Sequence, residues 1–391
     1  MERSQLRFVA DADVYKQGAL AATLHRDEGG TTTFVYDDDY VGRGGAPVAL
    51  SLRIGDTPVV TPSGGLPPFF AGLLPEGFRL SQLIKDVKTS PDDELSLLLA
   101  VGQDTPGDVQ VVPHGAPLTA AAPLVNADEP LDFSSLHLSA DTSALPGVQA
   151  KASSQMVTLP TTSRGASAIL KLTPKDYPRL VHNEAIHLSA AKHLGFPVAQ
   201  AHIVHDKRGE AGLLVRRFDR HVDNGVEHRL PLEDAGQIMG IVPAQKYSVN
   251  TEELILAVAN VAAASEAAKL ALYTQFVFSW LTGNGDLHAK NVSLLQTRGR
   301  WQVSPLYDVV CTLLYGDDTM ALPVDGRTKN LRRRHWDNLA DAISLPPRAR
   351  DRAITRALRA TSQVNLEDVG ITGSPLNGTL RELRYRRSEI A

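Results

Sequence analysis

Apolar residues follow two different periods along the chain, a period of two near its beginning and a helical period towards its end. Residues 7–60 hold short runs in which apolar and polar residues alternate, separated by Gly and Asp, and this pattern predicts an antiparallel sheet. A Pro- and Gly-rich stretch follows, and residues 70–84 then carry apolar residues at helical spacing. We therefore expect a sheet first and a loop that leads into a helix after it.

A second β-rich section begins near Ser143, beyond an Ala- and Pro-rich connection at 114–130. It predicts two strands around a Gly-containing bend and, further on, a β-hairpin that turns at 207–209. Between these, residues 183–194 are typical of a helix that ends at Gly195.

The last part of the chain has a helical pattern. We expect helices at 234–241, 251–265 and 266–281, and Arg-rich helices from residue 330 to the end. The terminal arginine runs are typical of a solvated helix face. Because β-rich segments come first and helical segments last, the pattern indicates an α+β protein.

The composition is that of an ordinary folded protein and excludes several classes. Of 391 residues, 43% are hydrophobic and 21% charged, and the net charge of -4 does not favour binding nucleic acid by charge alone. The single cysteine, Cys311, excludes an internal disulfide framework and fits a reducing cytoplasm. We expect no secretory signal at the start, and no membrane span at 254–281, because Glu266 and Lys269 interrupt that apolar tract.

Polar and ionisable side chains crowd into residues 284–291, between two apolar segments. Asp286 and Asn291 have the D-x-x-x-x-N spacing of a protein-kinase catalytic loop. Phosphoryl transfer needs one carboxylate to orient the attacking hydroxyl, and a second carboxylate with an amide oxygen to hold Mg²⁺ on the phosphates. Asp308 follows a short apolar stretch downstream of Asn291, where such a metal-binding carboxylate is expected.

A kinase site also needs a lysine beside the phosphates. Lys171 lies in an alternating, strand-like segment, and Glu184 follows it on the next predicted helix, where the two can pair. The chain has no Walker A spacing, so a P-loop NTPase is not indicated.

Each of these residues alone has an ordinary explanation. Lys171 fits an edge-strand lysine, Glu184 a first-turn acid favoured by the helix dipole, and Asp308 a helix cap. Asp286 and His288 also fit a transition-metal pair, although no Cys/His cluster accompanies them. The order of all these residues, with β-rich segments before and helical segments after, favours a kinase-like site.

The chain resembles the HipA-like serine/threonine kinases, the toxins of bacterial toxin–antitoxin pairs, over nearly its whole length. The resemblance rests on the ordered segments "FFAGLLPEGFRLSQL", "LPGVQAK", "NEAIHLSAAKHLGFPVAQAHI", "LLVRRFDR", "LEDAGQIMGIVPAQKY", "GNGDLHAKN" and "PLYDVV". It implies a bilobal, protein-kinase-like α+β fold. The β-rich N-terminal lobe would include an extra N-terminal subdomain at 1–118 and the kinase N-lobe at 130–230, and an all-helical C-terminal lobe would take 231–391.

The resemblance also implies a role for each matching residue. Asp286 would be the catalytic base, Lys290 a companion that stabilises the transferring charge, and Asn291 and Asp308 the Mg²⁺ ligands. Lys171, paired with Glu184, would contact the ATP phosphates. The other implied cofactor-binding residues are Gly147, Val148, Gln149 and Lys151 in a phosphate loop, Arg217 and Phe218 beside the adenine, and His288, which also fits a structural brace of the catalytic loop.

The implied activity is phosphate transfer from ATP to a hydroxyl group of a protein. Well-known members of this family phosphorylate an aminoacyl-tRNA synthetase and so arrest translation. A small helix-turn-helix antitoxin neutralises them, and the pair represses its own operon. We therefore expect a cytoplasmic toxin kinase that uses ATP and Mg²⁺, binds a HipB-like antitoxin, and contacts DNA only through that antitoxin.

One position departs from the family pattern. The family commonly has a serine three residues before the glycine of the phosphate loop, and its autophosphorylation inactivates the kinase. This chain has Ala144 there, with Ser143, Ser153 and Ser154 nearby. Self-inactivation at the usual position is therefore not expected, and any autophosphorylation would use a neighbouring serine.

Two other functions stay open. The segment "GDLHAKN" is similar to the loop of aminoglycoside and choline kinases, although those usually carry His where this chain has Asn284 and lack counterparts of "LLPEG" and "GVQAK". The other alternative is a catalytically silent corepressor bound to an antitoxin. The acceptor that gains phosphate distinguishes these alternatives from a protein kinase.

Overall fold

The N-terminal region is built on an antiparallel sheet with the strand order β4-β3-β2-β1-β5. In the computed structural model, residues 2–55, 58–62, 64–119, 125–133 and 156–391 are described. The strands are β1 (Asp11–Lys16), β2 (Ala19–Arg26), β3 (Thr32–Tyr36), β4 (Val59–Thr61) and β5 (Val109–Pro113). The antiparallel sheet predicted in residues 7–60 is therefore confirmed, and β5 joins it from further along the chain.

Helices cover this sheet and enclose an apolar core. They are the 3-10 helix η1 (Arg3–Phe8), α1 (Asp38–Gly42), α2 (Pro68–Gly72), α3 (Gly77–Val87), α4 (Glu94–Val101) and the 3-10 turn η2 (Gly102–Asp104). The helix expected at 70–84 is in fact two helices, α2 and α3. Pro75 lies between them, and a proline lacks the amide hydrogen that a continuous helix would need there.

The second sheet has the strand order β6-β7-β8-β10-β9. Its strands are β6 (Val125–Asn126), β7 (Val157–Ser163), β8 (Ala166–Leu172), β9 (Ala201–His205) and β10 (Ala211–Arg216). Both predicted strand pairs are confirmed: β7 and β8 form a hairpin, and β9 and β10 form another. The helix between them, α6 (Leu180–Ala191), begins three residues before the predicted start and continues as the 3-10 turn η4 (Lys192–Leu194).

The last part of the chain is mainly helical, as predicted. After a small hairpin of β11 (Arg220–Asp223) and β12 (Val226–Arg229), its elements are α7 (Ala235–Met239), η5 (Pro243–Gln245), α8 (Thr251–Val261), α9 (Ser265–Thr282), η6 (Ala289–Asn291), η7 (Thr312–Tyr315), α10 (Arg333–Ala342), α11 (Pro347–Thr361), η8 (Leu366–Val369) and α12 (Ser374–Ser388). Within the described residues, every helix is too short or too polar to cross a lipid bilayer.

The expectation of an all-helical C-terminal lobe is wrong in one respect. A three-stranded sheet, β13-β14-β15, lies in it, formed by β13 (Leu232–Asp234), β14 (Ser293–Thr297) and β15 (Arg300–Val303). Its first pair joins Leu232 to Leu295, far apart in the sequence, so tertiary pairing rather than a local pattern makes these short strands.

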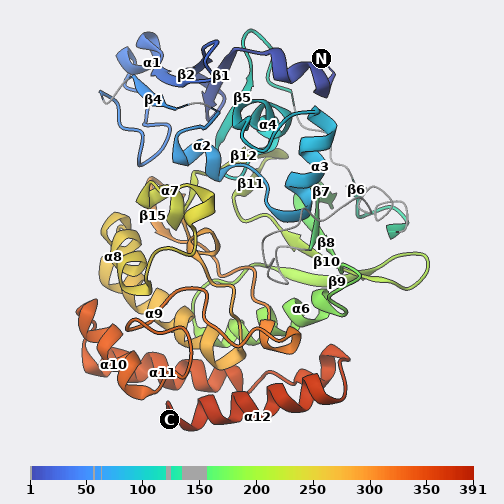
Figure 1. The fold of residues 1–391 in the computed structure, drawn as a ribbon, viewed down its shortest axis with the longest axis vertical. Coiled ribbons are helices and arrows are strands. Elements are labelled where there is room, and N and C mark those ends of the chain that lie inside the picture. Colours follow the sequence, from blue (N-terminus) through green and yellow to red (C-terminus); the bar gives the residue numbers. More distant parts are fainter. Residues whose placement is uncertain (1, 56–57, 63, 120–124, 134–155) are drawn as a thin grey trace.

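Figure 1 shows how these parts follow one another along the molecule. The N-terminal sheet and helices lie at one end, and α10, α11 and α12 lie at the other. The second sheet and α6 occupy one side of the middle, and α7, α8 and α9 occupy the opposite side. The predicted domain boundaries at 118, 130 and 230 stay predictions.

Candidate active site

The catalytic-loop segment begins where α9 ends. Most of the last turns of α9 are buried, and Gly283 closes the helix with a positive φ of 71°. A Cβ on Gly285 would come within 2.4 Å of the Thr319 carbonyl oxygen, so only glycine fits there. The two glycines therefore let the chain turn sharply from a buried helix into the polar loop.

Asp286 is buried and held in place by its neighbours. Its amide donates to the side-chain oxygen of Asn284 at 2.9 Å, and its carbonyl oxygen accepts from the Asn291 side-chain nitrogen at 2.8 Å. The Tyr247 hydroxyl donates to the Asp286 Oδ1 atom at 3.1 Å. The D-x-x-x-x-N spacing thus corresponds to a loop that is closed by the bond from Asn291 Nδ2 to the Asp286 carbonyl oxygen. The side-chain oxygen of Asn291 takes no part in that bond.

Lys171 brings the two other predicted carboxylates together. Its ammonium lies 2.7 and 2.9 Å from the two carboxylate oxygens of Glu184 and 2.8 Å from Asp308 Oδ1. Lys171 is on β8, which pairs with β7 and β10, so the edge-strand explanation is wrong. Glu184 lies in the second turn of α6 and Asp308 caps no helix, so the ordinary explanations for these two are wrong as well.

The charges of this cluster are strongly coupled. Burial disfavours the charged form of Lys171, but the carboxylates of Asp308 and Glu184 outweigh it and raise the pKa of Lys171. Burial also raises the pKa of Glu184 to about 7, with Lys171 opposing and Asp308 adding to the rise. The pKa of Lys171 and that of Glu184 are both raised because one buried ammonium group is shared by two carboxylates. A second cation would therefore stabilise the cluster.

Asp308 is connected to Asn291 through the residues that precede them. The Tyr307 hydroxyl donates to the Lys290 carbonyl oxygen at 2.8 Å and lies 2.7 Å from the Ser293 hydroxyl. Asp308 itself has a positive φ of 56°, which is uncommon for a residue with a side chain. These contacts hold a carboxylate and an amide oxygen on adjoining segments, and both are ligand types that Mg²⁺ takes.

The remaining predicted residues of this loop have mainly structural contacts. Lys290 Nζ donates to the Gly72 carbonyl oxygen of α2 at 2.8 Å. The buried His288 accepts from the Lys290 amide through Nδ1 at 3.2 Å, and its Nε2 lies 3.8 Å from Asp286 Oδ1. These contacts fit a structural brace of the loop, and a contact of His288 with the cofactor stays a prediction.

The predicted adenine-side residues lie at the end of β10. The Arg217 guanidinium donates to Asp104 at 2.8 Å and to Asp219 at 2.8 Å, so its side chain points towards the N-terminal region. The Phe218 ring lies 5.5 Å from the Tyr307 ring. A place for adenine beside this backbone stays a prediction.

The predicted phosphate loop falls outside the described residues. This applies to Gly147, Val148, Gln149 and Lys151, and also to Ala144, Ser143, Ser153 and Ser154. Among the described residues, no three His, Cys, Asp or Glu side chains gather in an arrangement that could hold a metal ion, which gives the transition-metal interpretation of Asp286 and His288 no support.

Two family comparisons decide what kind of protein this geometry belongs to. The HipA-like C-terminal domain matches residues 143–364, and the HipA N-terminal domain matches residues 12–112. The chain belongs to the HipA-like kinase family. The family resemblance inferred from the ordered motifs is therefore confirmed.

Relatives of this HipA-like kinase agree with that membership. Y4dM of Sinorhizobium fredii, named as a kinase, is 32% identical over 84% of this chain and 84% of its own. Y4mE of the same organism, also named as a kinase, is 27% identical over 78% of each chain. The serine/threonine-protein kinase toxin HipA of Shewanella oneidensis is 28% identical over 66% of each chain.

A solved structure shares the fold of this HipA-like kinase. It is the Shewanella oneidensis complex of HipA, HipB and operator DNA, which matches with a TM-score of 0.78 and 22% identity, over 97% of this chain and 96% of that chain. The predicted bilobal, kinase-like α+β fold is therefore confirmed.

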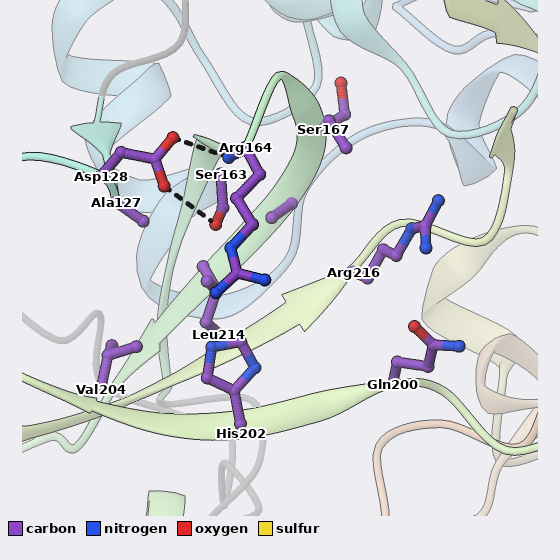
Figure 2. A pocket seen from close by; sticks show the side chains of 12 residues that line it. Ala127, Asp128, Ser163, Arg164, Ser167, Gln200, His202, Val204, Leu214 and Arg216 are labelled. Carbon is purple, nitrogen blue, oxygen red and sulfur yellow. Dashed lines mark hydrogen bonds between the residues drawn. The ribbon is translucent and has the colours of Figure 1, made fainter. Parts of the chain in front are cut away.

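A cavity of about 660 Å³ lies against the second sheet of the HipA-like kinase, and Figure 2 shows the side chains that line it. Ala168 of β8 and Leu214 of β10 line it, together with Arg164 and His202. Successive side chains of a strand point to opposite faces, so Ala168 and Lys171 lie on opposite faces of β8. The cavity therefore belongs to the outer face of the sheet and not to the candidate active site.

Several residues around the catalytic loop of this HipA-like kinase were not singled out from the sequence. They are Gly72, the last residue of α2, Glu76, which precedes α3, and Lys246 and Tyr247, which follow η5. All four belong to the quoted family segments "FFAGLLPEGFRLSQL" and "LEDAGQIMGIVPAQKY", and this was the available signal. Their contact with Asp286 and Lys290 depends on tertiary structure.

Proposed function

We propose that this chain is an ATP- and Mg²⁺-dependent serine/threonine protein kinase that acts in the cytoplasm as the toxin of a toxin–antitoxin pair. The observation that carries the proposal is the cluster of Lys171, Glu184 and Asp308. Tyr307, which precedes Asp308, donates to the Lys290 carbonyl oxygen and so ties this cluster to the loop that holds Asp286. A lysine with a helix glutamate and a nearby aspartate is the arrangement that phosphoryl transfer requires.

The donor set in this cluster fits Mg²⁺. Asn291 and Asp308 would hold the ion through an amide oxygen and a carboxylate, with phosphate oxygens and waters as further ligands. When bound, Mg²⁺ would neutralise the negative charge that develops on the phosphates during transfer. Both residues are held by contacts of the chain itself, because Asn291 Nδ2 donates to the Asp286 carbonyl and Lys171 binds Asp308.

Each of the other residues has a distinct task in this proposal. Asp286 orients the hydroxyl group of the acceptor and accepts its proton. The hydroxyl oxygen forms its bond to the γ-phosphorus of ATP while the bond from that phosphorus to the departing ADP breaks. Glu184 keeps Lys171 directed at the α- and β-phosphates. Lys290, which lies four residues after Asp286, places a positive charge near the transferring group. The phosphate loop at 147–151 would cover the nucleotide.

The partners are proposed from the family. The structural neighbour is described as a complex of HipA with HipB and operator DNA, so we propose a HipB-like helix-turn-helix antitoxin that also provides the contact with DNA. The proposed acceptor is a translation-related protein such as an aminoacyl-tRNA synthetase, and its phosphorylation would arrest growth.

Phosphoproteomics in cells tests this function. Bacteria expressing the wild-type chain should gain phosphoserine or phosphothreonine on one or a few proteins and stop growing, whereas cells expressing Asp286→Asn should do neither. Phosphate on Ser143, Ser153 or Ser154 of the chain itself would identify a shifted autophosphorylation site. Growth arrest that is equal in both strains, with no change in protein phosphorylation, would contradict the kinase function.

A further inference from the structure

Glu76, in the N-terminal region, lies beside two lysines at the catalytic loop, Lys246 and Lys290. We propose that Glu76, acting through Lys246 and Tyr247, positions the catalytic base Asp286, so that the N-terminal region completes the active site. This inference rests on the proposed function, because it takes Asp286 as the base. It goes further because it assigns roles to Lys246 and Tyr247 and to Glu76, which lies outside both predicted kinase lobes.

Glu76 is placed to serve another part of the molecule rather than its own helix. It is the residue before α3, yet its side chain makes no capping hydrogen bond there. Its Oε2 lies 2.7 Å from Lys246 Nζ, and its Oε1 lies 3.8 Å from Lys290 Nζ. The two lysine side chains are only 12% and 13% exposed, so both ammonium groups depend on nearby acceptors.

The segment that Glu76 holds contacts the catalytic loop at three points. The Tyr247 hydroxyl donates to Asp286 Oδ1 at 3.1 Å. The Ala289 amide donates to the Lys246 carbonyl oxygen at 3.3 Å. The Tyr247 ring meets the His288 ring edge-on, with the ring centroids 5.0 Å apart. Lys246 and Tyr247 therefore form a support along the loop rather than a single contact.

The support from Lys246 and Tyr247 affects the ionisation and the direction of the Asp286 carboxylate. A hydrogen bond donated to a carboxylate favours its ionised form and fixes its direction, and a general base must be ionised and aimed at the acceptor hydroxyl. Tyr247 is suited to this task because burial, together with the negative charge of Asp286, raises the pKa of its hydroxyl, which therefore stays a proton donor at neutral pH.

Glu76 links this support to the rest of the N-terminal region. Lys246 Nζ also lies 5.2 Å from the centre of the Tyr247 ring, so the position of the ammonium and that of the ring are coupled. Lys290 connects the loop to the same region by its bond to Gly72. Loss of the Glu76 charge would therefore loosen the loop at Asp286 and at Lys290.

Two conservative variants test the proposal, Tyr247→Phe and Glu76→Gln. In steady-state phosphotransfer assays, Tyr247→Phe should lower kcat roughly tenfold, because a hydrogen bond to a charged group is lost, and leave the KM for ATP unchanged. Glu76→Gln should lower kcat in the same way but by less, also with an unchanged KM for ATP.

Hydrogen–deuterium exchange gives a second readout that needs no activity. Glu76→Gln should speed the exchange of the amides in residues 286–291, including Ala289, while the core of α9 keeps wild-type protection. Asp86→Asn is the matched control, because Asp86 lies on α3, the helix that follows Glu76, and pairs with the exposed Arg3 at 2.6 Å. It should behave as wild type in both experiments.

The outcomes separate this proposal from the proposed function. A wild-type kcat and wild-type exchange rates in both variants would overturn the positioning role even if the enzyme is an active kinase. A wild-type protein as inert as Asp286→Asn would instead overturn the kinase function, and the exchange rates alone would then decide whether Glu76 and Tyr247 hold the loop.

Discussion

Lys171 joins the two lobes through a single ammonium group. Glu184 belongs to α6, which packs against the second sheet, and Asp308 comes from the C-terminal part of the chain, 137 residues from Lys171. The strand context of Lys171 and its distance from Glu184 were enough to predict their pair. The contact with Asp308 was predictable only as part of a metal–phosphate site, because no local pattern connects residues so far apart.

Replacement of Lys171 by Met tests its role. We expect the catalytic efficiency of phosphotransfer to fall by about 100-fold or more, because the phosphates lose a cation and Asp308 loses the partner that aims it. Lys269→Met is the matched control, since Lys269 pairs with an exposed glutamate on the surface of α9. Efficiency of Lys171→Met within threefold of the wild type would contradict the assignment.

At the scale of elements, the catalytic loop depends on the close approach of its backbone to another loop. Gly285→Ala would push a Cβ against the Thr319 carbonyl oxygen at 2.4 Å, which is closer than van der Waals contact allows. We expect this variant to lose about 1–3 kcal/mol of stability in urea denaturation and most of its phosphotransfer activity. Gly42→Ala is the control, because a Cβ on Gly42 would meet open space. It should keep both the stability and the phosphotransfer activity of the wild type. Wild-type behaviour of Gly285→Ala would show that the loop tolerates a side chain there.

Local patterns were sufficient to predict some elements and not others. The β9–β10 hairpin was predictable because its strands are adjacent in sequence and its turn contains Gly209. The β13–β14 pair was not, because β13 is only three residues long and its partner lies on the far side of α9. The break between α2 and α3 has a visible cause in Pro75, which the helical spacing around it concealed.

At the scale of the whole molecule, the N-terminal region is bound to both lobes. Asp219 accepts from Arg217, Arg220 and the Gly107 amide, and both guanidinium groups also bind Asp104 of the N-terminal region. The two arginines hold the pKa of Asp219 well below its usual range although burial opposes this. The motifs predicted the separate parts, but nothing in the sequence showed which carboxylates connect them.

A buried carboxylate in this interface makes stability depend on pH. Glu233 accepts from the Leu50 amide at 2.9 Å through Oε1, and its other oxygen is buried with no hydrogen-bond partner among the described residues. Burial raises the pKa of Glu233 to about 7 from a usual value near 4.5. Protonation therefore favours the folded state, and the stability from this group is complete below about pH 4.5 and lost as the pH rises through about 7.

The variant Glu233→Gln removes this dependence. Between pH 5.5 and 8, the free energy of unfolding of the wild type should fall by about 2 kcal/mol relative to the variant, measured by urea denaturation at both pH values. Burying the side-chain amide that Glu233→Gln introduces costs the same free energy at both pH values, so this cost cancels when the change between the two pH values is compared. Glu266→Gln, at an exposed position, should keep the wild-type dependence. Parallel pH curves for the wild type and Glu233→Gln would show that Glu233 stays ionised in the folded protein.

The most direct measurement is the transfer of γ-labelled phosphate from ATP with Mg²⁺ in a bacterial extract. The purified wild-type chain should label serine or threonine of a protein, and Asp286→Asn should label none, with both proteins equally folded by circular dichroism. Label on choline or an aminoglycoside in place of protein, or equal labelling of protein by the wild type and Asp286→Asn, would contradict a protein kinase that uses Asp286 as its base.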